Sequence, residues 1–155
     1  MSEIYDVDTE NKILSRLSSE ISKRGIIDVL RNQVVDRGVY LNLYYHQPSS
    51  DMNPDHQRLY ESNKFTIVRQ LHYSTKNENS IDMGLFLNGL PIVTMELKNQ
   101  LTGQNVKHSE NQYRYDRDPK NEPLLQFKRC LVHFCVDNNK VSMTTRLSGK
   151  KTYFL

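Results

Sequence analysis

Cysteine is scarce in this chain, and its scarcity argues against a disulfide and against a zinc site. Only Cys130 and Cys135 occur, five positions apart in an apolar run that we expect to be a strand. Their side chains would then point to opposite faces, so we do not expect them to pair. The five histidines lack metal-ligand spacing, and we expect His72 and His133 to be structural. Two free thiols are typical of a reducing compartment, which predicts a cytoplasmic location.

Long apolar runs and a strong excess of one charge are missing as well. No run approaches the length that spans a membrane, and the acidic start MSEIYDVDTE lacks the apolar core of a signal peptide. The formal net charge is only +3, so bulk charge is weak evidence for a nucleic-acid partner. The phosphate-binding motif G-x-x-x-x-G-K-[ST] does not occur, which argues against an ATP site of that kind.

The residues that are present indicate a globular chain. The 155 residues are 37% hydrophobic and 25% charged, a mixture typical of one folded domain. We therefore expect residues 1–155 to form a single domain. The last four residues, TYFL, are largely apolar, so we also expect the chain to be a piece of a longer protein.

Hydrophobic periodicity predicts helices and strands in alternating blocks. Helices are expected at residues 9–24, 26–35, 54–62 and 105–117. Strands are expected at residues 39–45, 65–74, 81–87, 92–98, 129–136 and 141–145. The central order is three antiparallel strands, a helix and further strands, which indicates an α/β (α+β) fold with a sheet packed against helices.

Three charged residues interrupt the apolar strands. Asp82 lies near the start of the segment SIDMGLFL, although Asp is disfavoured in strands. Glu96 and Lys98 end the segment PIVTMELK. Because side chains alternate along a strand, Glu96 and Lys98 share a face, whereas Leu97 points to the other.

The hairpin between these strands predicts that Asp82 joins the other two residues. A loop of residues 88–90 would pair Leu87 with Pro91. Counting five residues further along both strands then places Asp82 opposite Glu96. Directly opposed side chains have Cβ atoms about 5 Å apart, and two carboxylates that close repel each other unless a cation lies between them.

This set of residues predicts a metal-dependent hydrolytic site. Carboxylates favour Mg²⁺, with Mn²⁺ as a substitute, and the backbone carbonyl of Leu97 can add a further oxygen. Such an ion polarises a phosphodiester and lowers the pKa of the attacking water. Lys98 would lie beside the ion, where it can position or deprotonate a water or neutralise phosphate charge. The alternative is a surface hairpin with one salt bridge, because isolated matches to this pattern occur by chance.

Longer blocks resemble a known family. The stretches LFLNGLPIVTMELKN, LTGQNVKHSENQYRYDRDP and FKRCLVHFCVDNNKVSMTTRLSGK are similar to the N-terminal nuclease domain of the motor subunit (HsdR) of type I restriction enzymes. The upstream blocks KRGIIDVLRNQV and ESNKFTIVRQLHYS match the same family. The resemblance covers nearly the whole chain from about Leu14. It implies a PD-(D/E)XK nuclease with a restriction-endonuclease-like mixed sheet flanked by helices.

The resemblance also implies roles for single residues. Asp82 matches the metal-binding aspartate of the family, and Glu96 and Lys98 match its E-x-K motif. Glu61 stands where many members of the wider fold carry an acidic residue, although a solvated glutamate at a helix end explains it equally well.

The segment after E-x-K is the part expected to bind DNA. The family often carries Q-x-x-x-Y there, but Gln112 is followed by Tyr115 at three positions, so the motif is imperfect and the role of Tyr115 stays open. We expect Gln112, Lys107 and Arg114 to contact DNA, the basic residues through phosphates. Further basic residues would complete a phosphate-contacting rim: Arg117, Lys120, Arg146, Lys150 and Lys151. A solvated charge is the alternative for each basic residue, and an ordinary exposed polar residue is the alternative for Gln112.

The leading hypothesis is therefore a DNA endonuclease domain that uses Mg²⁺. The resemblance implies that ATP serves only the full-length subunit, and that the partners are DNA, a methyltransferase subunit (HsdM) and a specificity subunit (HsdS), with no membrane partner. Two alternatives stay open. The chain can be a non-catalytic DNA-binding or docking module that is inactive without the other parts, or a stand-alone repair or junction-resolving nuclease.

Overall fold

Two helices begin the part of the chain that the computed structural model describes, which comprises residues 7–50 and 52–155. They are α1 (Val7–Arg24) and α2 (Ile26–Asn32). Gly25 separates them with a φ of +90°, a conformation that glycine adopts readily. α2 ends earlier than the expected 26–35, because Gln33 takes a φ of +59°. The chain instead forms a two-stranded ribbon of β1 (Val34–Asp36) and β2 (Val39–Leu41).

A five-stranded mixed sheet follows, in the order β3-β4-β5-β6-β7. The strands are β3 (Phe65–His72), β4 (Ser80–Leu87), β5 (Leu90–Leu97), β6 (Val132–Val136) and β7 (Val141–Thr144). The antiparallel pairing of β3, β4 and β5 is as predicted, whereas β6 runs parallel to β5. The predicted α+β class with a mixed sheet is confirmed. Both cysteines are free and buried, but Cys130 precedes β6, so the expected strand at 129–136 begins late.

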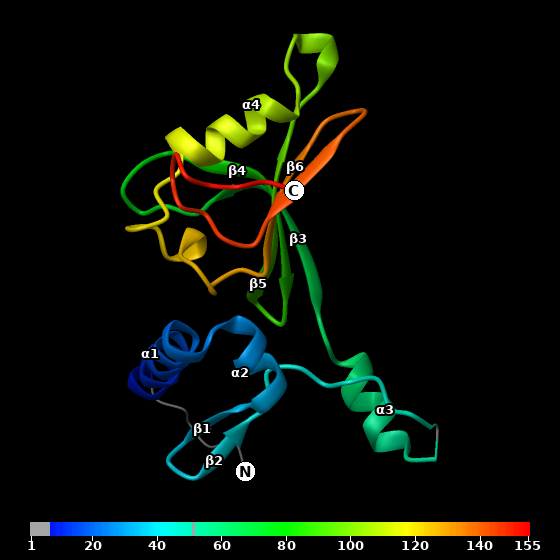
Figure 1. Cartoon of the computed structure of the whole chain (residues 1–155). Coiled ribbons are helices and arrows are strands. Elements are labelled where there is room, and N and C mark those ends of the chain that lie inside the picture. Colours follow the sequence, from blue (N-terminus) through cyan, green and yellow to red (C-terminus); the bar gives the residue numbers. More distant parts are fainter. Residues whose placement is uncertain (1–6, 51) are drawn as a thin grey trace.

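One face of the sheet carries α4 (Val106–Asn111), as Figure 1 shows. The expected helix at 105–117 consists of α4 and a π-helical turn, η2 (Gln112–Asp116). Short 3-10 turns, η1 (Gln100–Thr102) and η3 (Pro123–Leu125), complete the crossover from β5 to β6. The core under these segments comprises Ile81, Val106, Tyr113, Leu125, Cys135 and Leu147.

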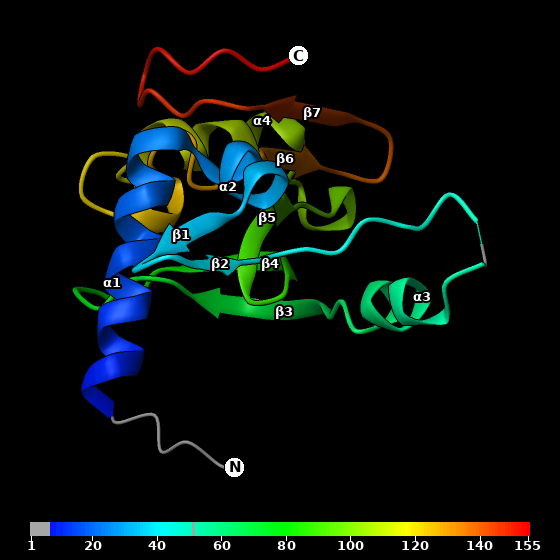
Figure 2. The ribbon, with the colours of Figure 1, turned by 90° about the horizontal axis from the view of Figure 1, so that it is seen from below.

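The N-terminal helices lie near the end of the sheet where β4 turns into β5 (Figure 1). A second buried cluster joins the N-terminal elements to the five-stranded sheet. It comprises Ile21, Ile26, Val29, Val34 and Leu90. α3 (Pro54–Glu61) has no buried residue and stands away from the rest of the molecule in Figure 2. Among the described residues, every helix is too short or too polar to span a bilayer.

Candidate active site

The β4–β5 hairpin turns on two residues and not on the three that the sequence predicted. Asn88 and Gly89 have φ values of +50° and +82°, and Leu87 pairs directly with Leu90. Asn-Gly is a favoured pair for a two-residue turn with positive φ at both positions. The loop assumed for the predicted register is therefore wrong by one residue.

A β-bulge restores the predicted register further along the hairpin. Ile92 is an extra residue on β5, because its two neighbours pair with consecutive residues of β4. Beyond it Met83 faces Met95, and Asp82 and Glu96 occupy the next position along the two strands. The two errors cancel, so the predicted juxtaposition of the carboxylates is the one that the sheet provides.

Asp82 is held on both of its carboxylate oxygens. Gln70 Nε2 donates to Oδ1 at 3.1 Å, and the backbone N–H of Leu97 donates to Oδ2 at 2.8 Å. Gln70 lies on β3, where its Oε1 also accepts from Ser80 Oγ at 3.2 Å. Strands β3 and β5 therefore fix the orientation of a carboxylate that belongs to the strand between them.

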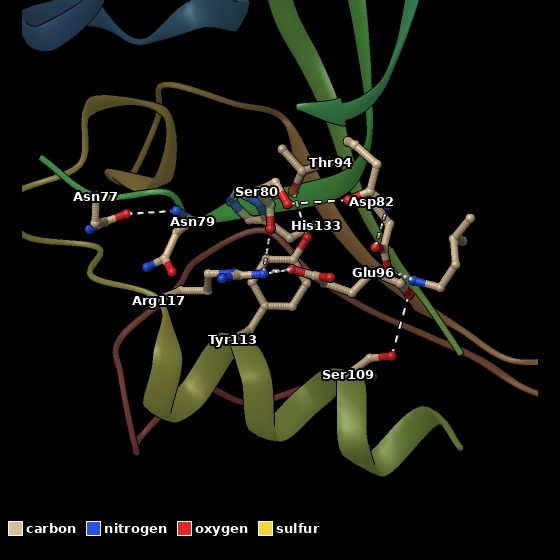
Figure 3. A network of polar contacts seen from close by, with 12 residues as sticks. Asn77, Asn79, Ser80, Asp82, Thr94, Glu96, Ser109, Tyr113, Arg117 and His133 are labelled. Carbon is tan, nitrogen blue, oxygen red and sulfur yellow. Dashed lines mark hydrogen bonds and ion pairs between the residues drawn. The ribbon is translucent and has the colours of Figure 1, made fainter. Parts of the chain in front are cut away.

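Glu96 is buried, with 1% of its surface exposed. Its Oε1 accepts from Arg117 Nε at 3.0 Å and from Arg117 Nη2 at 2.5 Å. Figure 3 shows the guanidinium between Glu96 and Ser80, whose backbone carbonyl accepts a further bond from Nη2 at 2.7 Å. The second oxygen, Oε2, is buried and has no hydrogen-bond partner among the described residues.

Burial raises the pKa of Glu96 to about 7, although the charge of Arg117 lowers it. Asp82 adds to the rise by repulsion, and Lys98 opposes it. A carboxyl group with this pKa is easily ionised by a cation placed beside it, because opposite charge favours the charged form. The electrostatics of the pair therefore suit a site that takes up a positive ion.

A buried polar network lies under the site on β5. Thr94 Oγ1 lies 2.8 Å from the hydroxyl of Tyr113 and 2.6 Å from His133 Nδ1. Burial lowers the pKa of His133 to about 4. Ser109 Oγ on α4 donates to the carbonyl of Glu96 at 3.3 Å. These bonds tie the helix side of the site to β5 and β6, and they give His133 the structural place that was predicted.

Lys98 directly follows β5, and its backbone N–H donates to the carbonyl of Val136 at 2.8 Å. Its side chain lines an open cavity of about 370 Å³. The other lining residues are Gln104, His108, Asn111, Gln112, Tyr115 and Asp116. Gln112 Oε1 is buried and, within the described part of the chain, has no hydrogen-bond partner. The structure thus brings Lys98, Gln112 and Tyr115 to one cavity.

The predicted basic contacts differ in their surroundings. Lys107 is exposed. Arg114 instead donates to Glu110 at 3.0 Å and to the carbonyl of Thr152 at 3.2 Å, and its DNA contact stays a prediction. Arg117 is only 8% exposed, so its expected place on the phosphate rim is wrong. The other rim residues are exposed: Lys120, Arg146, Lys150 and Lys151.

Glu61 is not brought to the carboxylates. It ends α3, where its Oε1 accepts from Gln57 Nε2 at 2.6 Å. The following strand begins with Phe65 opposite Leu87. Leu87 lies five residues along β4 from Asp82, a distance of about 17 Å at the usual rise per residue.

The sequence missed Arg117 as a partner of the site. The ion pair with Glu96 joins residues 21 positions apart. Nothing in the local pattern RYDRD distinguishes Arg117 from Arg114, which has the same charge and a similar neighbourhood. Only the crossover that packs η2 against β5 shows which of the two faces the carboxylate.

The residues present fit a sparsely coordinated divalent cation. The described part of the chain contains no group of three or more His, Cys, Asp or Glu residues that could hold a metal. The candidate oxygens are those of the Asp82 carboxylate, each of which already accepts one hydrogen bond, the Oε2 of Glu96 and the carbonyl of Leu97. Mg²⁺ keeps several waters and is often held by one or two carboxylates. The unpartnered, buried Oε2 of Glu96 is an oxygen that such an ion would satisfy.

Comparison with protein families gave a match over nearly the whole chain. A family model described as the type I restriction enzyme R protein N terminus matches residues 6–152. No curated protein and no solved structure gave a significant match. The matched range includes the N-terminal helices, the β4–β5 hairpin and the crossover with α4.

Proposed function

The chain belongs to the family of type I restriction enzyme R protein N-terminal regions, and we propose that it is the metal-dependent endonuclease domain of such an enzyme. Its reaction would be hydrolysis of DNA phosphodiester bonds within an ATP-dependent restriction complex. The observation that carries the proposal is the juxtaposition of Asp82 and Glu96 on β4 and β5, with one oxygen of the buried glutamate left without a partner.

Asp82, Glu96 and the carbonyl of Leu97 would hold Mg²⁺, or Mn²⁺ as a substitute. When bound, the ion supplies a Lewis acid that polarises the phosphodiester and lowers the pKa of a water. The chain itself contributes orientation. Gln70 and the Leu97 N–H hold the Asp82 carboxylate in one position, so little ordering remains to be done when DNA arrives.

Lys98 would act on the phosphate or on the attacking water. Its backbone N–H is anchored on β6, its charge lowers the pKa of Glu96, and its side chain lines the cavity that Gln112 also lines. An ammonium group at this place can hold a water in line or offset the negative charge that develops on the phosphate oxygens. Gln112 lines the same cavity, from which its amide would contact a phosphate or a base edge.

The partners proposed here are those expected for an R protein of a restriction complex. DNA would lie across the cavity, with Lys107 and the other exposed basic residues contacting phosphates in a salt-dependent manner. The methyltransferase and specificity subunits would act through the rest of the R protein. ATP would serve the full-length subunit alone.

Replacement of Asp82 tests the proposal. Asp82→Asn keeps the shape of the side chain but removes one of the two carboxylates, so Mn²⁺ should bind at least about 100-fold more weakly, and nicking of plasmid DNA should be lost. Binding is measured by calorimetry on the full chain. Asp28→Asn is the matched control, because Asp28 lies on α2, where it is paired with Arg24 of α1.

The outcomes separate the candidate functions. Mn²⁺ binding and nicking in the wild type, both lost in Asp82→Asn, support a nuclease. Mn²⁺ binding without nicking supports a site that becomes active only with the partner subunits. No binding of Mn²⁺ to the wild type, even with duplex DNA present, contradicts the catalytic assignment and leaves a docking module.

A further inference from the structure

Arg117 connects the two strands that carry the carboxylates. Its side chain is 5% exposed. It donates to Glu96 on β5 and to the carbonyl of Ser80 on β4, two residues before Asp82. The guanidinium carbon lies 5.8 Å from the centre of the Tyr73 ring. One side chain from the crossover therefore contacts both of the strands that carry the carboxylates.

Arg117 contacts only one of the two carboxylate oxygens of Glu96. Both Arg117 donors, Nε and Nη2, reach the same oxygen, Oε1. A guanidinium and a carboxylate that serve only each other often form two parallel bonds, one to each oxygen. Here Oε2 stays buried and unpartnered among the described residues, at a cost that a purely structural pair would avoid.

The other carboxylate is arranged independently. Asp82 is held by other groups, Gln70 and the backbone N–H of Leu97. Each carboxylate is thus oriented by separate groups of the protein. Groups of this kind, which touch the ligands and not the metal, fix ligand geometry and raise metal affinity.

We propose that Arg117 is the positioning residue of this metal site: it holds Glu96 through Oε1, so that Oε2 is free for the cation and the ion pair persists when the cation is bound. The inference rests on the proposed function. The competing model is a latch. In that model Arg117 occupies the position of the cation and must move away before the cation binds.

Arg117→Lys tests the inference while keeping the charge. A lysine has one donor atom at the end of a flexible stem, so it cannot hold Glu96 and Ser80 together as the planar fork does. We expect Mn²⁺ to bind about 10- to 100-fold more weakly, measured on the full chain by the loss of the free Mn²⁺ signal in electron paramagnetic resonance. DNA affinity without metal, measured by fluorescence anisotropy, should not change.

Arg24→Lys is the matched control. Arg24 is another arginine with carboxylate partners, Glu20 and Asp28; it lies on α1, and its side chain is 30% exposed. Its replacement should leave Mn²⁺ affinity within about twofold. Equal weakening in both variants would show a general effect of replacing a guanidinium that is paired with carboxylates, and it would overturn the inference. Tighter Mn²⁺ binding by Arg117→Lys would also overturn it, in favour of the latch.

A measurement on the wild type covers the case in which the variant does not fold. The Nε–Hε group of Arg117 gives its own resonance in a ¹⁵N–¹H spectrum. During a Mg²⁺ titration we expect this resonance to shift and to stay protected from exchange with water, because the pair to Oε1 is kept. Its disappearance on metal binding would overturn the inference.

Different results would contradict the metal site and the positioning role of Arg117. A wild type that binds no Mn²⁺ contradicts the metal site and this inference together. A wild type that binds Mn²⁺ through Asp82, with no weakening in Arg117→Lys, contradicts the inference alone and leaves the proposed nuclease function intact.

Discussion

His133 couples the stability of the sheet to pH through one buried side chain. Its Nδ1 faces Thr94 at 2.6 Å, and 2% of the residue is exposed. Burial holds its pKa at about 4, against an ordinary value near 6.5. As the pH falls below 6.5, His133 is protonated in the unfolded chain but not in the folded chain. The free energy of unfolding therefore decreases between pH 6.5 and pH 4.

Replacing this histidine should flatten that part of the pH profile. The shift corresponds to on the order of 3 kcal/mol between pH 7 and pH 4. His133→Gln should lack this loss, although it lowers stability at pH 7. Urea unfolding of both proteins at the two pH values measures the difference. Glu96, whose raised pKa has the opposite effect, is present in both proteins and cancels. An equal pH dependence of the free energy of unfolding in the wild type and in His133→Gln would contradict the lowered pKa of His133.

The catalytic candidates were predictable at this scale, whereas their partners were not. Asp82, Glu96 and Lys98 are conspicuous because charged residues interrupt otherwise apolar strands. Arg117 sits among other polar residues of a segment that reads as a solvated helix. Its burial depends on packing across 21 positions of sequence, which no local pattern records.

At the scale of elements, the β4–β5 turn does more than reverse the chain. The Asn88 side chain donates to the carbonyl of Leu43 at 2.9 Å and to Asn63 Oδ1 at 3.0 Å. It also accepts from the backbone N–H of Lys64 at 2.7 Å. The turn therefore fastens the segments on both sides of α3 to the end of the sheet.

The turn can be dissected with two variants. Asn88→Gly tolerates the positive φ but loses the three side-chain bonds, so we expect a loss of about 2 kcal/mol in the free energy of unfolding. Gly89→Ala keeps those bonds but strains a φ of +82°, at a cost of about 1 kcal/mol. Chemical denaturation ranks the two. A larger loss for Gly89→Ala would show that conformation, and not the bonds of Asn88, dominates the turn.

The elements themselves were largely predictable, and the failures have identifiable causes. The strands follow from alternation, and α1 from helical periodicity. The end of α2 was placed too late because Val34 and Val35 continue its apolar pattern, while the break comes from the backbone of Gln33. The bulge at Ile92 and the π-helical turn each insert one residue, and neither leaves a mark in composition.

At the scale of the whole molecule, one cluster joins the N-terminal helices to the sheet. Leu90 is the first residue of β5 and is 8% exposed. It packs with Ile21, Ile26, Val29 and Val34 from the N-terminal elements. The parallel placement of β6 beside β5 was not predicted, because it depends on the path of the crossover and not on either strand alone.

Truncation of Leu90 tests whether the two parts unfold together. Leu90→Ala should lower the free energy of unfolding by about 2 to 4 kcal/mol, because it leaves a cavity in a buried cluster. Leu101→Ala should have little effect, since Leu101 is 90% exposed. Calorimetry of Leu90→Ala should show a single unfolding transition at a lower temperature than that of the wild type. Two separate transitions in Leu90→Ala would mean that this cluster alone couples the helices to the sheet.

The pairing of Glu96 with Arg117 also sets the field that an approaching duplex would meet. Asp82 and Glu96 contribute two negative charges, and Arg117 and Lys98 two positive charges, so the metal-free site is formally neutral at full ionisation. A polyanion would not be repelled from it. The early encounter with DNA, and its dependence on ionic strength, would then be governed by the outer surface of a chain whose net charge is +3, and the site itself would act only at short range.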